Sequence, residues 1–207
     1  MQKFLPSAVR TSTLLWYPWL AIVFAVLLLP EYYLLGLVLL GTAFFAILKW
    51  LNQFAYNDLG DVLGFSSFKG GIDLPITLLS AIALGLLYRQ HLGLEVFLRH
   101  LDLFLFSAAA IGFTEELLFR GVAFAQFDRI SNSAIIISAT LHAAYKAAVQ
   151  TPYEHQMIFQ LFVLTFVVGL FLGWTRKRSS SIWLAILFHV LFDVIVYGDS
   201  STPYWVW

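Results

Sequence analysis

The sequence comprises 207 residues, of which 60% are hydrophobic and only 12% are charged, and its mean hydropathy is +0.83. Soluble domains are about 45–50% apolar and about 25% charged, so this composition excludes a water-soluble globule and favours a single membrane domain. The 12 basic residues balance the 12 acidic ones and there is no Cys, which excludes a basic nucleic-acid-binding surface, disulfides, thiolate zinc sites and cysteine nucleophiles.

Seven apolar runs lie between polar breaks, and each approaches the roughly 20 residues that a helix needs to cross a bilayer core of about 30 Å. The third opens with Pro75 in its first turn, where a missing N–H costs little. The predicted spans are 14–29, 32–51, 74–88, 101–127, 133–149, 156–174 and 181–197. We therefore predict an all-α integral membrane protein with about seven transmembrane helices. Residues 1–100 are expected to form N-terminal transmembrane helices and interfacial loops, and residues 101–207 a C-terminal core of four helices.

The loops between these spans differ in basic residues, which mark the cytoplasmic side of membrane proteins. Eight fall on one side and two on the other; they are Lys3, Arg10, Lys49, Lys69, Arg129 and residues 176–178 against Arg89 and Arg99. This bias predicts a cytoplasmic N-terminus. The first span reads as a retained helix rather than a signal peptide, because bulky residues 16–18 lie within it and no small-residue cleavage site follows.

Three of the predicted spans contain ionisable side chains. A charged group in hydrocarbon costs roughly 2.5–3.5 kcal/mol on insertion scales, so spans that retain several of them are expected to use them. The groups are Glu115, Glu116 and Arg120 on the fourth span, His142 on the fifth, and His189 and Asp193 on the seventh. Glu116 and Arg120 are four residues apart and share a helix face. Glu115 is rotated by about 100° from Glu116 and points toward a neighbouring helix.

The predicted depths of three of these groups agree. With a rise of about 1.5 Å per residue, His142 and His189 lie roughly 12–14 Å from the cytoplasmic ends of their helices, and Glu115 lies at roughly 18 Å. A carboxylate and two imidazoles from different helices are therefore expected to meet in one pocket. Lys146 follows His142 by one turn, and we expect it to extend toward the outer interface.

These residues occur in three motifs that resemble those of a known family. Residues 114–121, Thr-Glu-Glu-Leu-Leu-Phe-Arg-Gly, resemble the Glu-Glu-x-x-x-Arg motif of the CAAX prenyl endopeptidase and bacteriocin-processing (CPBP, or Abi) intramembrane proteases. His142 is similar to the second motif, Phe-x-x-x-His, with Ser138 at the Phe position. His189 and Asp193 are similar to the third, His-x-x-x-Asn/Asp. The resemblance covers about the C-terminal half of the chain, and it implies that the four helices of residues 101–207 form a CPBP-like catalytic core.

The resemblance implies an endopeptidase in which Glu115 and His142 activate a water and His189 donates to the developing oxyanion. An Asn amide could donate directly, whereas an ionised Asp cannot. Asp193 is therefore expected to orient and charge His189. Glu116 and Arg120 are expected to hold Glu115, as a structural clamp or as a catalytic pair, or Arg120 binds a substrate carboxylate. No cofactor is needed for this chemistry.

Three alternatives remain open from the sequence. Two His with Glu115 or Asp193 would satisfy a three-ligand zinc site, and the family is often labelled metalloprotease, although the chain has no His-Glu-x-x-His motif. The same groups would also suit a proton relay in a proton-coupled transporter. A non-catalytic peptide-binding or immunity membrane protein is the third.

The partners expected are a membrane-associated protein or peptide substrate and the lipid bilayer, with no nucleic acid. The expected location is a bacterial or archaeal cell membrane. CAAX processing, bacteriocin maturation, pheromone processing and cleavage of sorting tails are all compatible with these residues.

Overall fold

The computed structural model describes residues 12–54, 56–66, 68, 71–129, 133–150 and 158–199. Within these residues every regular element is a helix, which confirms the all-helical prediction. The elements are α1 (Ser12–Leu28), α2 (Tyr33–Leu51), α3 (Tyr56–Leu63), α4 (Asp73–His91), α5 (Phe104–Glu116), the π-helix η2 (Leu117–Ala123), α6 (Phe124–Asp128), α7 (Ala134–Gln150), α8 (Ile158–Ser179) and α9 (Trp183–Tyr197).

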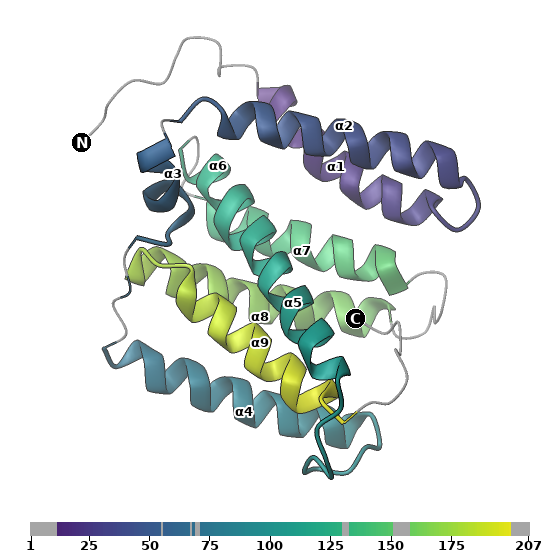
Figure 1. Cartoon of the computed structure of the whole chain (residues 1–207), viewed down its shortest axis with the longest axis vertical. Helices are drawn as coiled ribbons and strands as arrows, with labels where there is room; N and C mark the ends of the chain where they lie inside the picture. The colour runs from purple at the N-terminus through teal and green to yellow at the C-terminus, as the bar shows by residue number, and fades with distance from the viewer. Residues whose placement is uncertain are drawn as a thin grey trace.

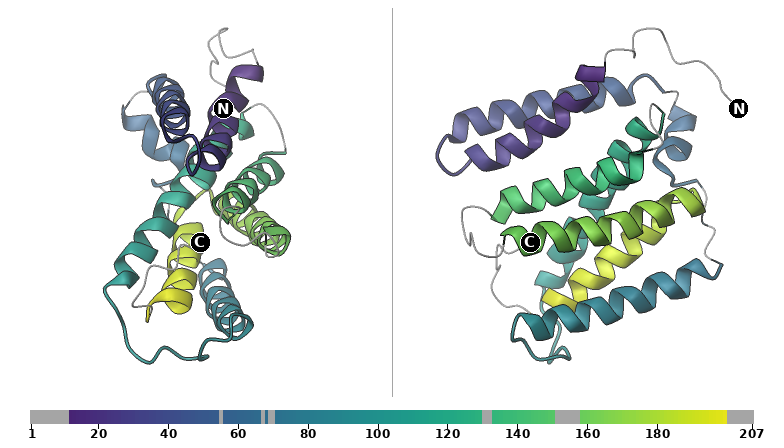
Figure 2. Two further views of the ribbon diagram at one scale, coloured as in Figure 1. Left: turned by 90° about the vertical axis from the view of Figure 1, so that its right-hand side faces the viewer. Right: turned by 180° about the vertical axis from the view of Figure 1, so that it is seen from behind.

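The helices are arranged along one long axis. The α1–α2 hairpin lies at one end, α4 lies at the other, and α7, α8 and α9 lie between them (Figure 1 and the right-hand view of Figure 2). The continuous rod of α5, η2 and α6 crosses these central helices and links the two ends (Figure 1). The helices that contain the three motifs therefore occupy the middle of the molecule.

A helix occurs at each of the seven predicted spans, but their ability to cross a membrane differs. By length and apolar composition, two helices of the described residues qualify as spans, Tyr33–Leu51 and Ile158–Ser179. The apolar helices Leu15–Leu28 and Trp183–Tyr197 are shorter. The fourth predicted span is interrupted by the π-helix η2, and the polar stretch 52–71 contains the additional short helix α3.

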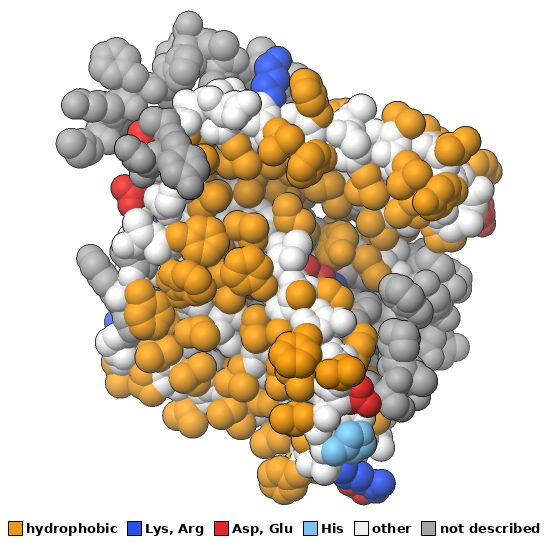
Figure 3. All heavy atoms as spheres, viewed as in Figure 1, with side chains coloured by type: hydrophobic (Ala, Val, Ile, Leu, Met, Phe, Trp, Pro, Cys, Tyr) orange, Lys and Arg blue, Asp and Glu red, His pale blue; other side chains and the backbone are white. Residues whose placement is uncertain are grey.

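The outer surface of the bundle is strongly apolar. Leu34, Phe45 and Phe159 are each about 70% exposed or more, with exposed fractions of 77%, 69% and 75%. In the space-filling view, hydrophobic side chains cover most of the face shown (Figure 3). Because soluble monomers rarely expose contiguous apolar patches of this kind, this surface is suited to lipid.

The largest buried apolar cluster fixes α1 and α2 against η2, α6 and α7. Trp19 and Phe127 are almost completely buried in it together with Phe119. The Trp19 indole Nε1 donates a hydrogen bond of 2.8 Å to Oε1 of Gln126, so the polar edge of the indole is satisfied inside the cluster. The N-terminal hairpin thus supports the helix segment that contains Arg120.

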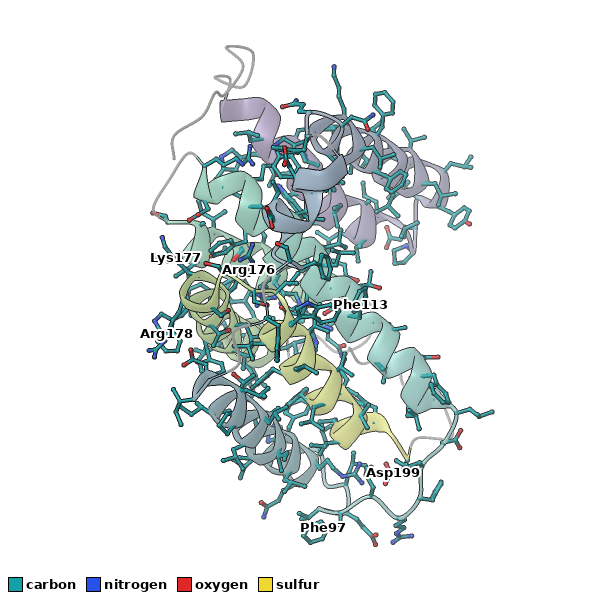
Figure 4. All side chains as sticks on the ribbon, turned by 60° about the vertical axis from the view of Figure 1, so that its left-hand side comes forward. Phe97, Phe113, Arg176, Lys177, Arg178 and Asp199 are labelled. Carbon is teal, nitrogen blue, oxygen red and sulfur yellow. The ribbon has the colours of Figure 1, made fainter. Side chains whose placement is uncertain are left out.

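The C-terminal end of α8, which contains three basic residues, packs against the segment that follows α3. Gly64 has a φ of +86°, and a Cβ at this position would lie 2.5 Å from Cζ of Arg176. Glycine is therefore required both by the backbone conformation and by the guanidinium packed on it. Arg176, Lys177 and Arg178 lie close together near the C-terminal end of α8, and Asp199 lies well apart from them, beyond the end of α9 (Figure 4).

Glycines also let the helices around the ionisable residues approach closely. A Cβ at Gly112 on α5 would lie 3.0 Å from Oδ2 of Asp193, and one at Gly169 on α8 would lie 2.9 Å from Nη2 of Arg120. Small residues at helix contacts are typical of membrane bundles, because packing replaces the hydrophobic driving force there. These two contacts bring α5, α8 and α9 together around the charged groups.

Candidate active site

Six side chains were predicted to form the site, and the structure brings all of them into one buried cluster. They come from α5 (Glu115 and Glu116), η2 (Arg120), α7 (His142) and α9 (His189 and Asp193). None exposes more than 8% of its surface. The convergence of one carboxylate and two imidazoles from separate helices is therefore confirmed.

Glu115 points away from Glu116 and toward α7, as its rotation on the helix predicts. Its Oε2 lies 2.9 Å from Nε2 of His142. Its Oε1 lies 2.8 Å from Nζ of Lys146. Both carboxylate oxygens are thus held by residues that are one turn apart on α7.

Arg120 connects Glu116 to His142. Its Nη1 lies 3.1 Å from Oε1 of Glu116 and 2.6 Å from Nδ1 of His142. Because a guanidinium can only donate hydrogen bonds, Nδ1 of His142 must accept, and the ring proton is assigned to Nε2. His142 therefore donates from Nε2 to Oε2 of Glu115. The contact with Arg120 sets this tautomer.

His189 is oriented by Glu116 and not by Asp193. Its Nδ1 donates a hydrogen bond of 2.8 Å to Oε1 of Glu116. Its Nε2 lies 3.6 Å from Oδ2 of Asp193 and 3.7 Å from Oε2 of Glu115, which is longer than a hydrogen bond. Glu116 of α5 thus supplies the hydrogen bond that orients the ring, which the sequence did not indicate, and Asp193 is a charged neighbour of Nε2.

Lys146 is the residue of the cluster that the sequence reasoning missed. It was expected to extend toward the outer interface, but it is only 6% exposed and pairs with Glu115. The available signal was its position one turn after His142, which places it on the same face of α7.

An aromatic ring supports His142. The ring of Phe119 stacks on the imidazole with a centroid distance of 4.6 Å and an interplanar angle of 22°. Ser138, at the position where the second motif usually has Phe, is buried but supplies no ring. The aromatic support of His142 thus comes from the helix of the first motif.

A cavity of about 390 Å³ opens beside the cluster, between α4, α7, α8 and α9. Its polar end is formed by His142, Lys146, His189 and Asp193, and the rest is mainly leucine, phenylalanine and tyrosine side chains. Apolar pockets with a few convergent polar groups are typical of binding sites. The contribution of α4, from Leu84 to His91, was not predicted.

Several buried polar atoms in the cluster have no hydrogen-bond partner among the described residues. They include Oε2 of Glu116, Nε and Nη2 of Arg120, and Oδ2 of Asp193. Buried polar groups are nearly always satisfied in folded proteins, and exceptions point to sites of function.

The donor set was tested for a metal ion. One ligating atom each from Glu115, His142 and His189 lies within 4.8 Å of the others, which is compatible with a three-ligand site. Ligation by Nε2 of His142 would move its proton to Nδ1, where it would face an N–H of Arg120 across 2.6 Å. The described arrangement therefore fits a metal only partly, since Arg120 opposes the required tautomer.

The comparisons with known proteins agree with the motifs. Residues 97–195 match the Type II CAAX prenyl endopeptidase Rce1-like family. This range includes the Glu-Glu motif, both histidines and Asp193. No curated protein and no solved structure gives a significant match to the chain.

Proposed function

We propose that this chain, which is Rce1-like over residues 97–195, is an intramembrane endopeptidase that hydrolyses a peptide bond in a membrane-associated protein or peptide. One observation carries the proposal. The Glu115 carboxylate contacts His142 at 2.9 Å and lies 3.7 Å from His189, beside an apolar cavity that both histidines line. Two imidazoles at a cavity wall and a buried acid directly behind them, in contact with His142, are the groups that general acid–base hydrolysis needs.

In the proposed reaction Glu115 is the general base. A water at its Oε2 loses a proton to the carboxylate while its oxygen attacks the peptide carbonyl carbon. The proton then passes to the leaving amine, from Glu115 directly or through His142, as the C–N bond breaks. His142 is neutral in the assigned tautomer, so its N–H orients Oε2 before the reaction begins.

His189 is proposed to stabilise the oxyanion. Glu116 holds its Nδ1 at 2.8 Å and His189 lines the cavity, so Nε2 is the nitrogen proposed to donate to the substrate. The carboxylates of Asp193 and Glu115 lie 3.6 Å and 3.7 Å from this nitrogen and favour a proton there. A charged donor at a developing oxyanion, in a site that excludes water, stabilises the transition state strongly.

Glu116 and Arg120 are proposed to position the reacting groups. Both are completely buried, and their printed contacts are with other residues of the cluster. Glu116 holds His189, and Arg120 holds His142 and Glu116. This supports the clamp interpretation over a carboxylate-binding role for Arg120.

The proposed setting is a bilayer that the chain crosses seven times with its N-terminus in the cytoplasm. The helix bounds support this, since a helix lies at each predicted span. The basic residues 176–178 lie just before the start of α9, and Asp199 follows the end of that helix, so in this arrangement the two groups lie on opposite membrane faces.

A zinc-dependent form of the same protease is the second candidate, because Glu115, His142 and His189 offer three ligand atoms within 4.8 Å. We expect cleavage to persist in chelator, since Arg120 opposes ligation by His142. Metal analysis of the purified protein tests this. Stoichiometric zinc that is lost together with activity would replace the metal-free mechanism.

Cleavage of a membrane peptide by the purified protein in lipid vesicles tests the function itself. Glu115→Gln keeps the shape of the side chain but removes the base, so we expect kcat to fall by about 10²–10⁴-fold with the melting temperature retained. His142→Ala is expected to lose cleavage as well. The matched control is Glu95→Gln, because Glu95 is exposed and pairs with Arg99 outside the cluster. Full activity of Glu115→Gln would contradict the proposed base.

A further inference from the structure

The cluster contains more carboxylates than fixed cations. Glu115, Glu116 and Asp193 contribute three acidic groups, and Arg120 and Lys146 contribute two basic groups, all of them buried. Uncompensated charge inside a protein is very costly. Each cation in this cluster is therefore expected to be essential to the arrangement of the acids around it.

Arg120 already pairs with Glu116 and therefore does not serve the other acids of the cluster in the same way. Its Nη1 contacts both Glu116 and His142, and it does not line the cavity. Lys146 does line the cavity, together with Asp193. The Asp193 carboxylate has favourable Coulomb interactions with two groups, first with His189, whose Nε2 lies 3.6 Å from its Oδ2, and then with the ammonium group of Lys146.

Lys146 also determines how Glu115 is held. His142 contacts one carboxylate oxygen at 2.9 Å, and Lys146 contacts the other at 2.8 Å. Two contacts from successive turns of α7 fix the plane of the carboxylate, whereas one contact would let it rotate. The position of Oε2 of Glu115, which lies 3.7 Å from Nε2 of His189, therefore depends on Lys146 as well as on His142.

Asp193 explains why a second cation is needed. The third motif accepts Asn or Asp, and an amide at this position would bring no charge. In this chain the Asp carboxylate adds a third acid, and its Oδ2 has no hydrogen-bond partner among the described residues. The cation that lines the same cavity can offset that charge.

We infer that Lys146 is a positioning residue of this site, which holds Glu115 and offsets the charge of Asp193, so that the two residues depend on each other. The kinetic part of this inference rests on the proposed endopeptidase function. The mutual dependence of Lys146 and Asp193 does not, because it is also a property of folding stability.

Four variants of the full chain in lipid vesicles test the inference: Lys146→Met, Lys146→Arg, Asp193→Asn and the double variant Lys146→Met/Asp193→Asn. For Lys146→Met we expect kcat to fall by about tenfold to a hundredfold, because a misplaced catalytic group costs this much, with KM little changed. Lys146→Arg restores part of the loss, and Asp193→Asn alone costs less than Lys146→Met. The double variant is expected to exceed Lys146→Met in both kcat and melting temperature.

Lys177→Met is the matched control, since it removes a Lys–Asp pair of 3.5 Å at the exposed surface of α8. A Lys146→Met variant that equals this control in kcat and melting temperature would overturn the inference. A double variant no better than Lys146→Met in either measurement would also overturn it. If Lys146→Met does not fold, recovery of folding in the double variant supports the pair, and failure to recover rejects it.

The proposed function and this inference can fail separately. A wild-type protein that cleaves no membrane peptide would reject the function. The melting temperatures of the same four variants would still show whether Lys146 and Asp193 depend on each other.

Discussion

Helix α9 takes part in two polar networks, and they differ in how completely they are satisfied. At its C-terminal end Arg89 of α4 is buried and uses all three nitrogens. Nε donates to the carbonyl oxygen of Glu95, Nη1 to those of Ile195 and Val196, and both Nη atoms to the Asp199 carboxylate. Asp199 lies just beyond the C-terminal end of α9, whereas residues 176–178 precede the start of that helix. We call this network closed, because every guanidinium nitrogen of Arg89 has a hydrogen-bond partner.

The network around His189, in the middle of the bundle, is open in the sense that several of its buried polar atoms lack a hydrogen-bond partner among the described residues. Arg120 forms hydrogen bonds only through Nη1, while its Nε and Nη2, Oε2 of Glu116 and Oδ2 of Asp193 have no hydrogen-bond partner among the described residues. His189 and Asp193 also line a cavity, whereas Arg89 does not. A buried arginine therefore does not by itself indicate function. Unsatisfied polar atoms next to a cavity distinguish the candidate active site from a structural staple.

Replacing Arg120 should have the largest effect, because it would break the open network. Arg120→Met leaves the buried Glu116 carboxylate without its cation, which is expected to cost about 3–5 kcal/mol of unfolding free energy. His142 also loses the donor that sets its tautomer, so cleavage should be lost in whatever fraction remains folded. Thermal unfolding and peptide cleavage measure the two effects. Arg178→Met, at a half-exposed arginine paired with Asp73, is the control.

Arg89→Met should affect stability alone. Three backbone carbonyl groups and Asp199 lose a donor, and Asp199 stays partly hydrated, so we expect a loss of about 1–3 kcal/mol in unfolding free energy. The kcat of the folded protein should not change, because Arg89 contacts none of the reacting groups. Arg99→Met, which removes an exposed pair with Glu95, is the control. A fall in kcat as large as that of Arg120→Met would remove the distinction between the two networks.

The smallest effect concerns pH. The hydrogen bonds from Arg89 lower the pKa of Asp199 below its ordinary value of 3.8. Its contribution to stability is therefore present above pH 3.8 and is lost as the pH falls through the lowered pKa. The melting temperature of Asp199→Asn should be lower than that of the wild type at neutral pH, and the difference should shrink in acid below pH 3.8. A difference that stays constant would show that the charge of Asp199 contributes nothing.

Much of the architecture follows from local pattern. Apolar runs and their polar or proline breaks predicted a helix at each of the seven spans, because helix length and hydrophobicity are local properties. The i, i+4 pairing of Glu116 with Arg120 follows from helix geometry in the same way. Equal depth in separate spans was enough to predict that Glu115, His142 and His189 converge.

The contacts that the sequence did not predict join segments that are far apart in the chain. Arg89 was assigned to an outer loop by its polarity, yet the backbone carbonyls of Ile195 and Val196 bury it. Lys146 was expected at the interface, because nothing near it in sequence reveals that Glu115 faces it. The polar partner of His189 came from α5 instead of α9. Rotation of a helix about its own axis decides such contacts, and periodicity in a nearly uniformly apolar helix gives little information on rotation.

The π-helical stretch Leu117–Ala123 has a consequence for the spacing of the whole central rod. Each amide in it bonds one residue farther back than in an α-helix, so the segment accommodates surplus chain length in its widened turns. Deleting one residue within this stretch would let it relax to ordinary α-helix while the segment beyond it keeps nearly the same rotation relative to Glu115. Deleting one residue in the regular α-helix that follows would instead turn the rest by about 100°, so Phe127 would leave its apolar cluster. A single-residue deletion in the rod should therefore be tolerated better inside the π-helical stretch than in α6.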